Sequence, residues 1–264
     1  MPIPNRKTFP TDRDDLIVVQ TDDGSHTLQS VGTNDLYHSG CGAKAETEHV
    51  YLGNSNVTAR LQRQQPTRVL EIGLGTSMGM LMSMDLAQRH HAALSYVALE
   101  LDWISAQTLA FLQPQQWLSQ FSNAGSEFGA APNDLLHQYN AFREKLPAQV
   151  PEGDYHWQLD PLRQLTVVVG DLLNWKVASV APFDAIFYDP FSAGSAPELW
   201  DEACFAKMRS VALPHTRLVT YCCSRKVRDA LHAAAWDVQR VPGPVGGKRE
   251  VLYAVPRVDS PPID

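Results

Sequence analysis

The chain has 264 residues, enough for one domain with a sizeable core, and its 44% hydrophobic and 19% charged residues are typical of a globular protein. Its formal net charge of −7 does not suggest nucleic-acid binding, so a polyanionic partner would need a local basic patch. No segment approaches the ~18 consecutive apolar residues of a membrane helix, no signal peptide is recognisable, and the four cysteines show no metal or redox spacing, so we expect a cytoplasmic protein without a metal.

The first part of the chain predicts a β-hairpin followed by helices. Residues 1–12 have the composition of a loose polar lead. Leu16–Gln20 and His26–Val31 flank an Asp-Gly turn, which predicts a hairpin packed beside the main sheet. Residues 35–52 begin as a glycine-containing loop and continue as a helix with early acids, and Val57–Gln64 predicts a further helix.

The next stretch predicts the strand–turn–helix unit around which the fold is organised. Residues 68–72 form a short apolar run that carries an acid near its end. Gly73 and Gly75 then form a G-x-G turn, and Met78–Arg89 has apolar residues at helical spacing. Glycines allow positive φ and let a ligand approach the main chain. An ordinary tight βα turn has the same pattern, so the motif alone is weak.

Three more strands follow, and each ends at an acid. Residues 94–99 end on Glu100, residues 165–169 are followed by Gly170 and Asp171, and residues 183–188 end on Asp189. Because parallel strands end at one edge of a sheet, these acids and Glu71 are expected together where doubly wound folds bind ligands. Glu100 is placed to accept hydrogen bonds from the two hydroxyls of a ribose.

The rest of the chain predicts the remaining strands and helices of an α/β fold. The alternation predicts a Rossmann-like, mainly parallel sheet with an antiparallel last strand. We expect residues 1–56 to be an N-terminal extension and residues 57–264 the Rossmann-like domain, with a helical insertion at about 113–163. The other expected elements are helices at 103–112, 133–146, 197–213 and 225–235, and strands at 155–159 (pairing with the third strand), 218–222 (which includes Cys222), 236–241 and 250–255.

The acids at the sheet edge distinguish two classes of nucleotide ligand. A pyrophosphate would favour a third glycine where Met78 stands, and it would be repelled by Glu71. A ligand with a cationic centre, an amine and a ribose suits a row of carboxylates better. S-adenosylmethionine has these three groups. The pattern therefore predicts a class I S-adenosylmethionine-dependent methyltransferase.

Three segments carry a more specific pattern: residues 37–54, from Tyr37-His38-Ser39 to Tyr51-Leu52-Gly53-Asn54; residues 188–200, from Tyr188-Asp189-Pro190-Phe191 to Pro197-Glu198-Leu199-Trp200; and Gly247-Lys248-Arg249-Glu250-Val251-Leu252. These segments resemble one family in particular, the methyltransferase part of MnmC. This resemblance spans roughly residues 35 to 255 and implies methylation of the aminomethyl group of wobble uridine in tRNA, giving 5-methylaminomethyl(-2-thio)uridine.

The strand ends and the resemblance together give a set of candidate site residues. We expect Asp189 to be the catalytic carboxylate that orients the acceptor amine and takes its proton. The residues expected at the acceptor or tRNA are Phe191, Tyr37, Lys248 and Arg249, with Gly42 in a lid and Arg225, Lys226 and Arg228 in the same basic cluster. The residues expected at the cofactor are Glu71, Gly73, Gly75, Thr76, Glu100, Leu101, Gly170, Asp171, Asp189 and Glu46, the last forming a pair with Glu48 that a solvated helix face would explain equally well.

The chain departs from the family pattern at three positions, and other functions stay open. Pro190 stands where the family has glycine, Ser195 replaces a lysine, and Cys41 replaces an asparagine. The length matches a form that lacks the flavin oxidase domain to which this domain is often fused. The alternatives are a methyltransferase acting on a protein or small amine, a polyamine aminopropyltransferase-like enzyme, and a silent binding module.

Overall fold

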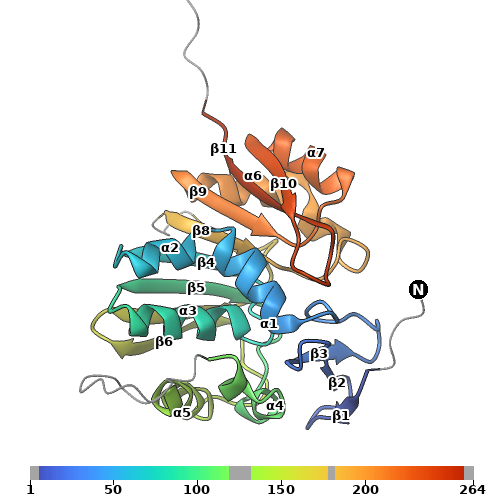
Figure 1. Ribbon diagram of the computed structural model, residues 1–264, viewed down its shortest axis with the longest axis vertical. Helices are drawn as coiled ribbons and strands as arrows, with labels where there is room; N and C mark the ends of the chain where they lie inside the picture. The colour runs from blue at the N-terminus through green and yellow to red at the C-terminus, as the bar shows by residue number, and fades with distance from the viewer. Residues whose placement is uncertain (1–5, 119–131, 178–181, 259–264) are drawn as a thin grey trace, which may run out of the picture.

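The computed structural model describes residues 6–118, 132–177 and 182–258 and contains two β-sheets, the larger of which carries helices on both faces (Figure 1). The described strands of the larger sheet lie in the order β10-β11-β9-β8-β4-β5-β7-β6. Their bounds are β4 Thr67–Ile72, β5 Leu94–Glu100, β6 Gly153–Asp160, β7 Arg163–Val169, β8 Phe183–Tyr188, β9 Ala212–Thr220, β10 Trp236–Pro242 and β11 Glu250–Pro256.

The pairing of these strands is that of a doubly wound α/β sheet with modified edges. Strands β9, β8, β4, β5 and β7 run parallel to one another. Strand β11 is antiparallel to both β9 and β10 and lies between them, and β6 adds an antiparallel strand beyond β7. The predicted fold class, the antiparallel last strand and the pairing of β6 with β7 are therefore confirmed.

Helices cover the two faces of the large sheet and bury two apolar layers. One layer lies against α2, α3 and α5, and the other against α6 and α7. No helix in the described ranges is long and apolar enough to cross a bilayer. The helices are α1 Ala43–Glu46, the π-helix η1 Thr47–Gly53, α2 Val57–Gln62, α3 Met78–Arg89, α4 Ala106–Phe111, the 3₁₀-helix η2 Pro114–Gln116, α5 Pro132–Arg143, the 3₁₀-helix η3 Pro197–Trp200, α6 Glu202–Ser210 and α7 Arg225–Ala233.

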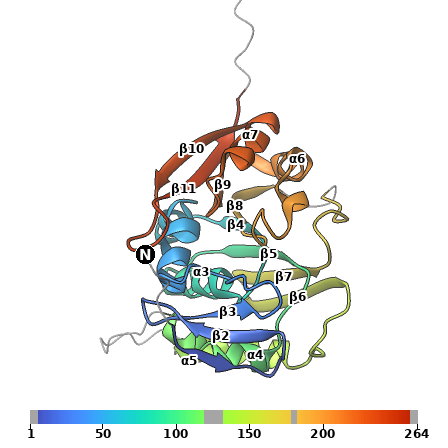
Figure 2. The ribbon, with the colours of Figure 1, turned by 90° about the vertical axis from the view of Figure 1, so that its right-hand side faces the viewer.

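The N-terminal part forms a separate antiparallel sheet of β1 (Thr8–Pro10), β2 (Leu16–Gln20) and β3 (His26–Ser30). The predicted hairpin is confirmed, and Gly24 takes the positive φ of 84° that its turn requires. The expectation of a loose lead over residues 1–12 is wrong for Thr8–Pro10, because these residues hydrogen-bond along β2. The sequence gives no sign of this strand, because three exposed residues cannot show an alternation of apolar and polar side chains. Figures 1 and 2 both place this sheet beside α4.

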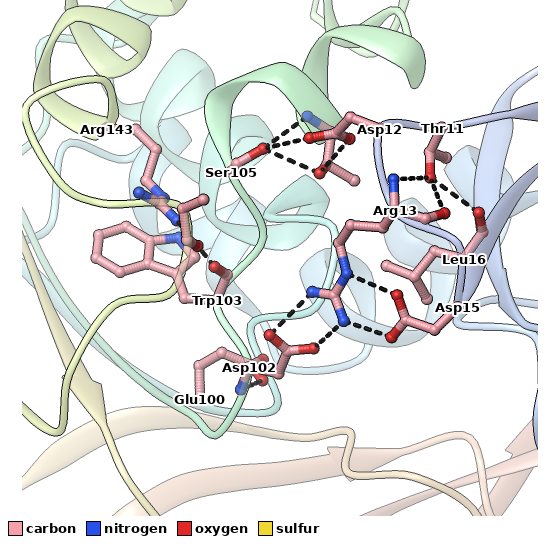
Figure 3. A network of polar contacts seen from close by, with 12 residues as sticks. Thr11, Asp12, Arg13, Asp15, Leu16, Glu100, Asp102, Trp103, Ser105 and Arg143 are labelled. Carbon is pink, nitrogen blue, oxygen red and sulfur yellow. Dashed lines mark hydrogen bonds and ion pairs between the residues drawn. The ribbon is translucent and has the colours of Figure 1, made fainter.

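Polar contacts join the small sheet to the loop that leaves β5 (Figure 3). The Arg13 guanidinium lies 2.5 Å from the Asp15 carboxylate and 2.7 Å from the Asp102 carboxylate. The Asp12 carboxylate accepts hydrogen bonds from the hydroxyls of Ser105 at 3.2 Å and Thr108 at 2.7 Å. Side chains of the N-terminal segment, Asp12 and Arg13, therefore hold the β5–α4 loop in place.

Two predicted elements beyond β8 have different bounds in the structure. The expected helix 197–213 is interrupted at Asp201, whose side chain accepts a hydrogen bond from the Cys204 N–H at 2.9 Å and starts α6. The chain before this cap is η3, and β9 already begins at Ala212. The expected strand 218–222 therefore begins earlier and ends at Thr220, so Cys222 lies beyond the strand.

Two helix predictions nearer the middle of the chain also needed correction. The helix expected over 103–112 begins only at Ala106, because the Ser105 side chain accepts from the Thr108 N–H and caps it. The best helix of the insertion is present as α5, ending at Arg143 rather than residue 146. Residues 119–131 of the expected insertion lie outside the described residues.

Candidate active site

A cavity of about 380 Å³ opens at the carboxyl ends of β4, β5, β7 and β8, and residues 35–40 and 46–51 form its other wall. The volume lies within the roughly 300–1,000 Å³ of ordinary ligand sites. Most of the predicted site residues border this cavity, whereas Gly42, Glu48, Arg225, Lys226, Arg228 and Arg249 do not. Those that do are Tyr37, Glu46, Glu71, Gly73, Gly75, Thr76, Glu100, Leu101, Gly170, Asp171, Asp189, Phe191 and Lys248.

The glycine turn after β4 forms the floor of the cavity. Gly73 and Gly75 have φ of 86° and 51°. A Cβ at Gly73 would collide with the Asp189 carbonyl oxygen, so this glycine lets the ends of β4 and β8 approach each other. A Cβ at Gly79, on the first turn of α3, would lie 2.7 Å from Glu71 Oε1. These glycines therefore make room for the acids.

Two buried polar groups on the floor have no hydrogen-bond partner among the described residues. They are Glu71 Oε2 and Thr76 Oγ1. Burial raises the pKa of Glu71 well above its ordinary value, the Tyr96 hydroxyl lowers it, and the charges of Asp189 and Glu100 raise it further. A buried polar atom without a partner is costly, so both atoms are positioned to be satisfied by a ligand.

The Glu100 carboxylate is held by main-chain donors at the middle of the cavity. Its Oε2 accepts from the Gly75 N–H at 2.7 Å and its Oε1 from the Asp102 N–H at 2.8 Å. Burial raises the pKa of Glu100, whereas these two N–H groups lower it. A carboxylate oxygen has a second lone pair, so each oxygen keeps an acceptor site for a ribose hydroxyl.

Apolar and polar groups alternate where β5 and β7 end. The Leu101 side chain borders the cavity and is 69% exposed, so it offers an apolar surface to a ligand. The Gly170 N–H donates to the Glu100 carbonyl at 2.9 Å. Asp171 Oδ1 accepts from the Leu173 N–H at 2.9 Å, which orients this carboxylate within its turn. This end of the cavity fits a flat ring with polar edges.

The opposite end of the cavity gathers Asp189 from the end of β8 and Glu46 from α1. Burial raises the pKa of Asp189 well above its ordinary value, the Tyr51 hydroxyl lowers it, the charge of Glu46 raises it, and Lys248 lowers it. Burial also raises the pKa of Glu46, although its carboxylate accepts from the Ser39 N–H at 2.6 Å. Two close acids in an apolar setting favour a cationic ligand.

Aromatic rings and one lysine also border the cavity. The rings of Tyr37 and Phe191 meet edge to face with centroids 5.3 Å apart, and Phe191 is 46% exposed. The Lys248 ammonium lies 4.0 Å from the centroid of the Tyr221 ring. Arg249, its neighbour in sequence, does not border the cavity.

Some residues that the sequence predicted at the site lie outside the cavity, and other residues that border the cavity were not predicted. Glu48 does not border the cavity and its carboxylate lies 3.9 Å from the Lys44 ammonium, so the pair with Glu46 is split. Gly42 is not at the lid, since a Cβ there would meet the Asp23 side chain at 2.6 Å. The sequence reasoning missed Tyr51 and Tyr221. Tyr221 follows the end of β9, a position that the strand-end argument could have found.

The residues present fit a ligand that carries positive charge. Glu46, Glu71, Glu100 and Asp189 all face one cavity, and burial raises the pKa of each. A sulfonium and an ammonium would relieve their mutual repulsion, and a ribose would meet Glu100. The fold and this acid-lined cavity are those of a class I S-adenosylmethionine-dependent methyltransferase.

Comparison with known proteins agrees with that class of enzyme. A family described as S-adenosyl-L-methionine-dependent methyltransferase matches residues 137–257. The tRNA 5-methylaminomethyl-2-thiouridine biosynthesis bifunctional protein MnmC of Stutzerimonas stutzeri is 32% identical over 230 residues, which cover 85% of this chain and 32% of the relative. MnmC of Leptospira borgpetersenii is 27% identical over 224 residues, covering 83% of this chain and 32% of the relative.

A solved structure shows the same fold over most of the chain. The crystal structure of MnmC2 from Aquifex aeolicus superposes with a TM-score of 0.68 at 20% identity, covering 96% of this chain and 74% of that one. The chain spans about a third of the length of the curated relatives that it matches (32% of the first two). Over most of its length the chain is therefore similar to one part of the MnmC proteins.

Proposed function

We propose that this methyltransferase methylates the primary amine of an aminomethyl group on wobble uridine in tRNA, giving 5-methylaminomethyl(-2-thio)uridine. The observation that carries the proposal is the buried carboxylate of Asp189, at the end of the cavity beyond the glycine turn. An amine acceptor arrives as a cation and is attracted by this carboxylate. The names of the MnmC relatives give the tRNA nucleoside whose synthesis they serve, which supports the same acceptor.

The cofactor would lie along the carboxyl ends of the strands, with its charged methionine portion and its nucleoside portion bound by different residues. Glu71 and Thr76 offer unpartnered oxygens to the methionine portion, next to Gly73 and Gly75. In this proposal Glu46 faces the cofactor ammonium. The nucleoside portion is assigned to Glu100 at the ribose, Leu101 against the adenine face, and Gly170 and Asp171 at the adenine amino edge.

The chain's own contribution to the reaction is alignment and proton removal. When bound, S-adenosylmethionine supplies an electrophilic methyl group. Asp189 is placed to accept a hydrogen bond from the acceptor amine and to take its proton, which frees the nitrogen lone pair. The Tyr37 and Phe191 rings at the mouth would hold the uridine ring by stacking and exclude water. Most of the rate would come from holding the reacting groups in line.

The tRNA backbone would be met outside the cavity by a local basic surface. Lys248 borders the cavity, and Arg249 follows it in the turn between β10 and β11. Contacts of this kind fix the position of a nucleic acid without reading its sequence.

We also propose residues 1–56 as an extension to a methyltransferase domain of residues 57–264, with an insertion at about 113–163. Activity on tRNA implies work in the cytoplasm.

The test is transfer of a labelled methyl group from S-adenosylmethionine to undermodified tRNA, isolated from cells in which the wobble uridine carries the aminomethyl group but lacks its final methyl group. The proposal expects label in 5-methylaminomethyl(-2-thio)uridine after digestion of the tRNA, and no label in fully modified tRNA. Free polyamines and a protein extract are offered in parallel reactions. Label in either of these, with none in the undermodified tRNA, would show that the acceptor is a different amine.

A further inference from the structure

The π-helix η1 determines which side chains reach the acceptor end of the cavity. The Asn54 N–H donates to the carbonyl of His49, five residues earlier, at 3.2 Å. In an α-helix, residues five apart point about 140° away from each other. The wider turn of η1 reduces that angle, so Glu46 and Tyr51 both face the cavity. π-helical turns are frequent at functional sites.

The Tyr51 side chain is buried, and its hydroxyl lacks a hydrogen-bond partner among the described residues. The residue is 3% exposed, and its ring packs against Phe187 of β8 with centroids 5.6 Å apart. The hydroxyl is close enough to Asp189 to lower the pKa of that carboxyl. A hydroxyl that borders a ligand cavity without a partner has free donor and acceptor capacity.

A purely structural role explains the ring of Tyr51 but not its hydroxyl. Phenylalanine would fill the same space against Phe187 without leaving a buried polar atom unsatisfied, which costs free energy. A ligand that contacts both Tyr51 and Asp189 would remove that cost.

We propose that the Tyr51 hydroxyl binds the acceptor amine together with Asp189, and that it does so through both of its hydrogen-bonding functions. The O–H donates to the Asp189 carboxylate, and the hydroxyl oxygen accepts one N–H of the amine. A second N–H of the amine points to Asp189. With two N–H bonds fixed, the nitrogen lone pair has one direction left, toward the methyl group. This inference rests on the proposed amine acceptor and adds a second residue that orients it.

The proton step in this arrangement balances without another reactant. The acceptor enters as R–NH₃⁺, and one proton moves to the Asp189 carboxylate, giving a neutral amine and a carboxylic acid. Tyr51 stays protonated throughout and favours the carboxylate before the transfer. The other titratable groups around Tyr51 and Asp189 are Glu46 of α1, Glu71 of β4, Tyr96 of β5, Tyr221 after β9 and Lys248 of the β10–β11 turn.

The test is Tyr51→Phe, which removes the hydroxyl and keeps the ring. Calorimetric titration with S-adenosylmethionine should give a Kd within about twofold of the unsubstituted protein. Turnover on undermodified tRNA should fall about 10- to 100-fold, the range for a lost hydrogen bond to a charged group. The limb of the pH–rate profile that rises with pH should move to higher pH, because Asp189 loses the hydroxyl that lowers its pKa.

Tyr155→Phe is the matched control, since its hydroxyl donates to the Pro151 carbonyl on an exposed edge and does not border the cavity. Its turnover and pH profile should be unchanged. The inference is overturned if Tyr51→Phe keeps its turnover and pH profile, or if cofactor binding falls as much as turnover. Failure of the unsubstituted protein to methylate tRNA is a separate result, and the two variants are then compared on whichever amine it labels. If it labels none, both proposals fall.

Discussion

Replacing Glu100 by glutamine should separate cofactor binding from catalysis. Its two oxygens accept main-chain N–H groups at 2.7 and 2.8 Å, so the side chain is fixed and cannot rotate away to compensate. Glu100→Gln keeps the shape but loses the charge, and its NH₂ group would face one of these N–H donors. The variant should therefore bind S-adenosylmethionine more weakly.

The magnitude follows from the bonds at stake. Hydrogen bonds to a charged group contribute about 1.5–3 kcal/mol, and 1.4 kcal/mol corresponds to a tenfold change in Kd. Loss of one such bond to the ribose raises Kd about 10- to 100-fold. Asp189→Asn should leave Kd within about threefold and lower turnover about 100-fold or more, the scale of general-base catalysis.

Isothermal titration with S-adenosylmethionine and single-turnover methyl transfer at saturating cofactor measure the two effects. Glu48→Gln is the control, because that carboxylate lies outside the cavity and should change neither quantity. An equal loss of cofactor affinity in Glu100→Gln and Asp189→Asn would refute the division of roles between the two acids.

Three further predictions concern the surroundings of the cavity. Arg13→Ala removes two partly exposed ion pairs, so Tm should fall by only a few degrees in calorimetry. The cofactor Kd should rise severalfold, up to about tenfold, because Asp102 is held less firmly, and an unchanged Kd would show that the small sheet does not support the site. The acids around the cavity bind protons more tightly when folded, so the stability of the ligand-free protein should fall as pH rises above about 4. Cofactor should oppose that loss, and its Tm increment should grow with pH over the same window; a constant increment would contradict this. Lys248→Glu with Arg249→Glu should weaken tRNA binding in filter assays and reduce its salt dependence, with cofactor affinity unchanged within about threefold; unaltered tRNA binding would place the RNA elsewhere.

The sheet could be predicted from sequence because its strands are buried on both faces. Such strands appear as short apolar runs, and each run here ends in an acid or a glycine that marks the next turn. The bounds of α3 were predicted to the residue, since the turn before it and His90 after it both interrupt its apolar spacing. The acids on these strand ends then met at one cavity, as parallel topology requires.

The other half of the site depends on geometry that the sequence does not encode locally. A π-helix has no residue signature, so Tyr51 in a helical stretch is indistinguishable from a core tyrosine. Glu46 and Glu48 were equivalent by composition, and only the helix turn decides that Glu46 faces the cavity. Lys248 and Arg249 differ in the same way, because neighbours in a turn point in different directions.

The net charge of −7 is a weaker argument against a tRNA partner than it first appears to be. Seven of the 29 acidic residues border the cavity, and burial raises the pKa of four of them, Glu46, Glu71, Glu100 and Asp189. Protons or a cationic ligand neutralise them before they repel a phosphate at the surface. A distant phosphate is also screened from them by salt over about 8–10 Å. The charge that a tRNA meets is therefore set by the residues around the mouth, where Lys248 lies, rather than by the total.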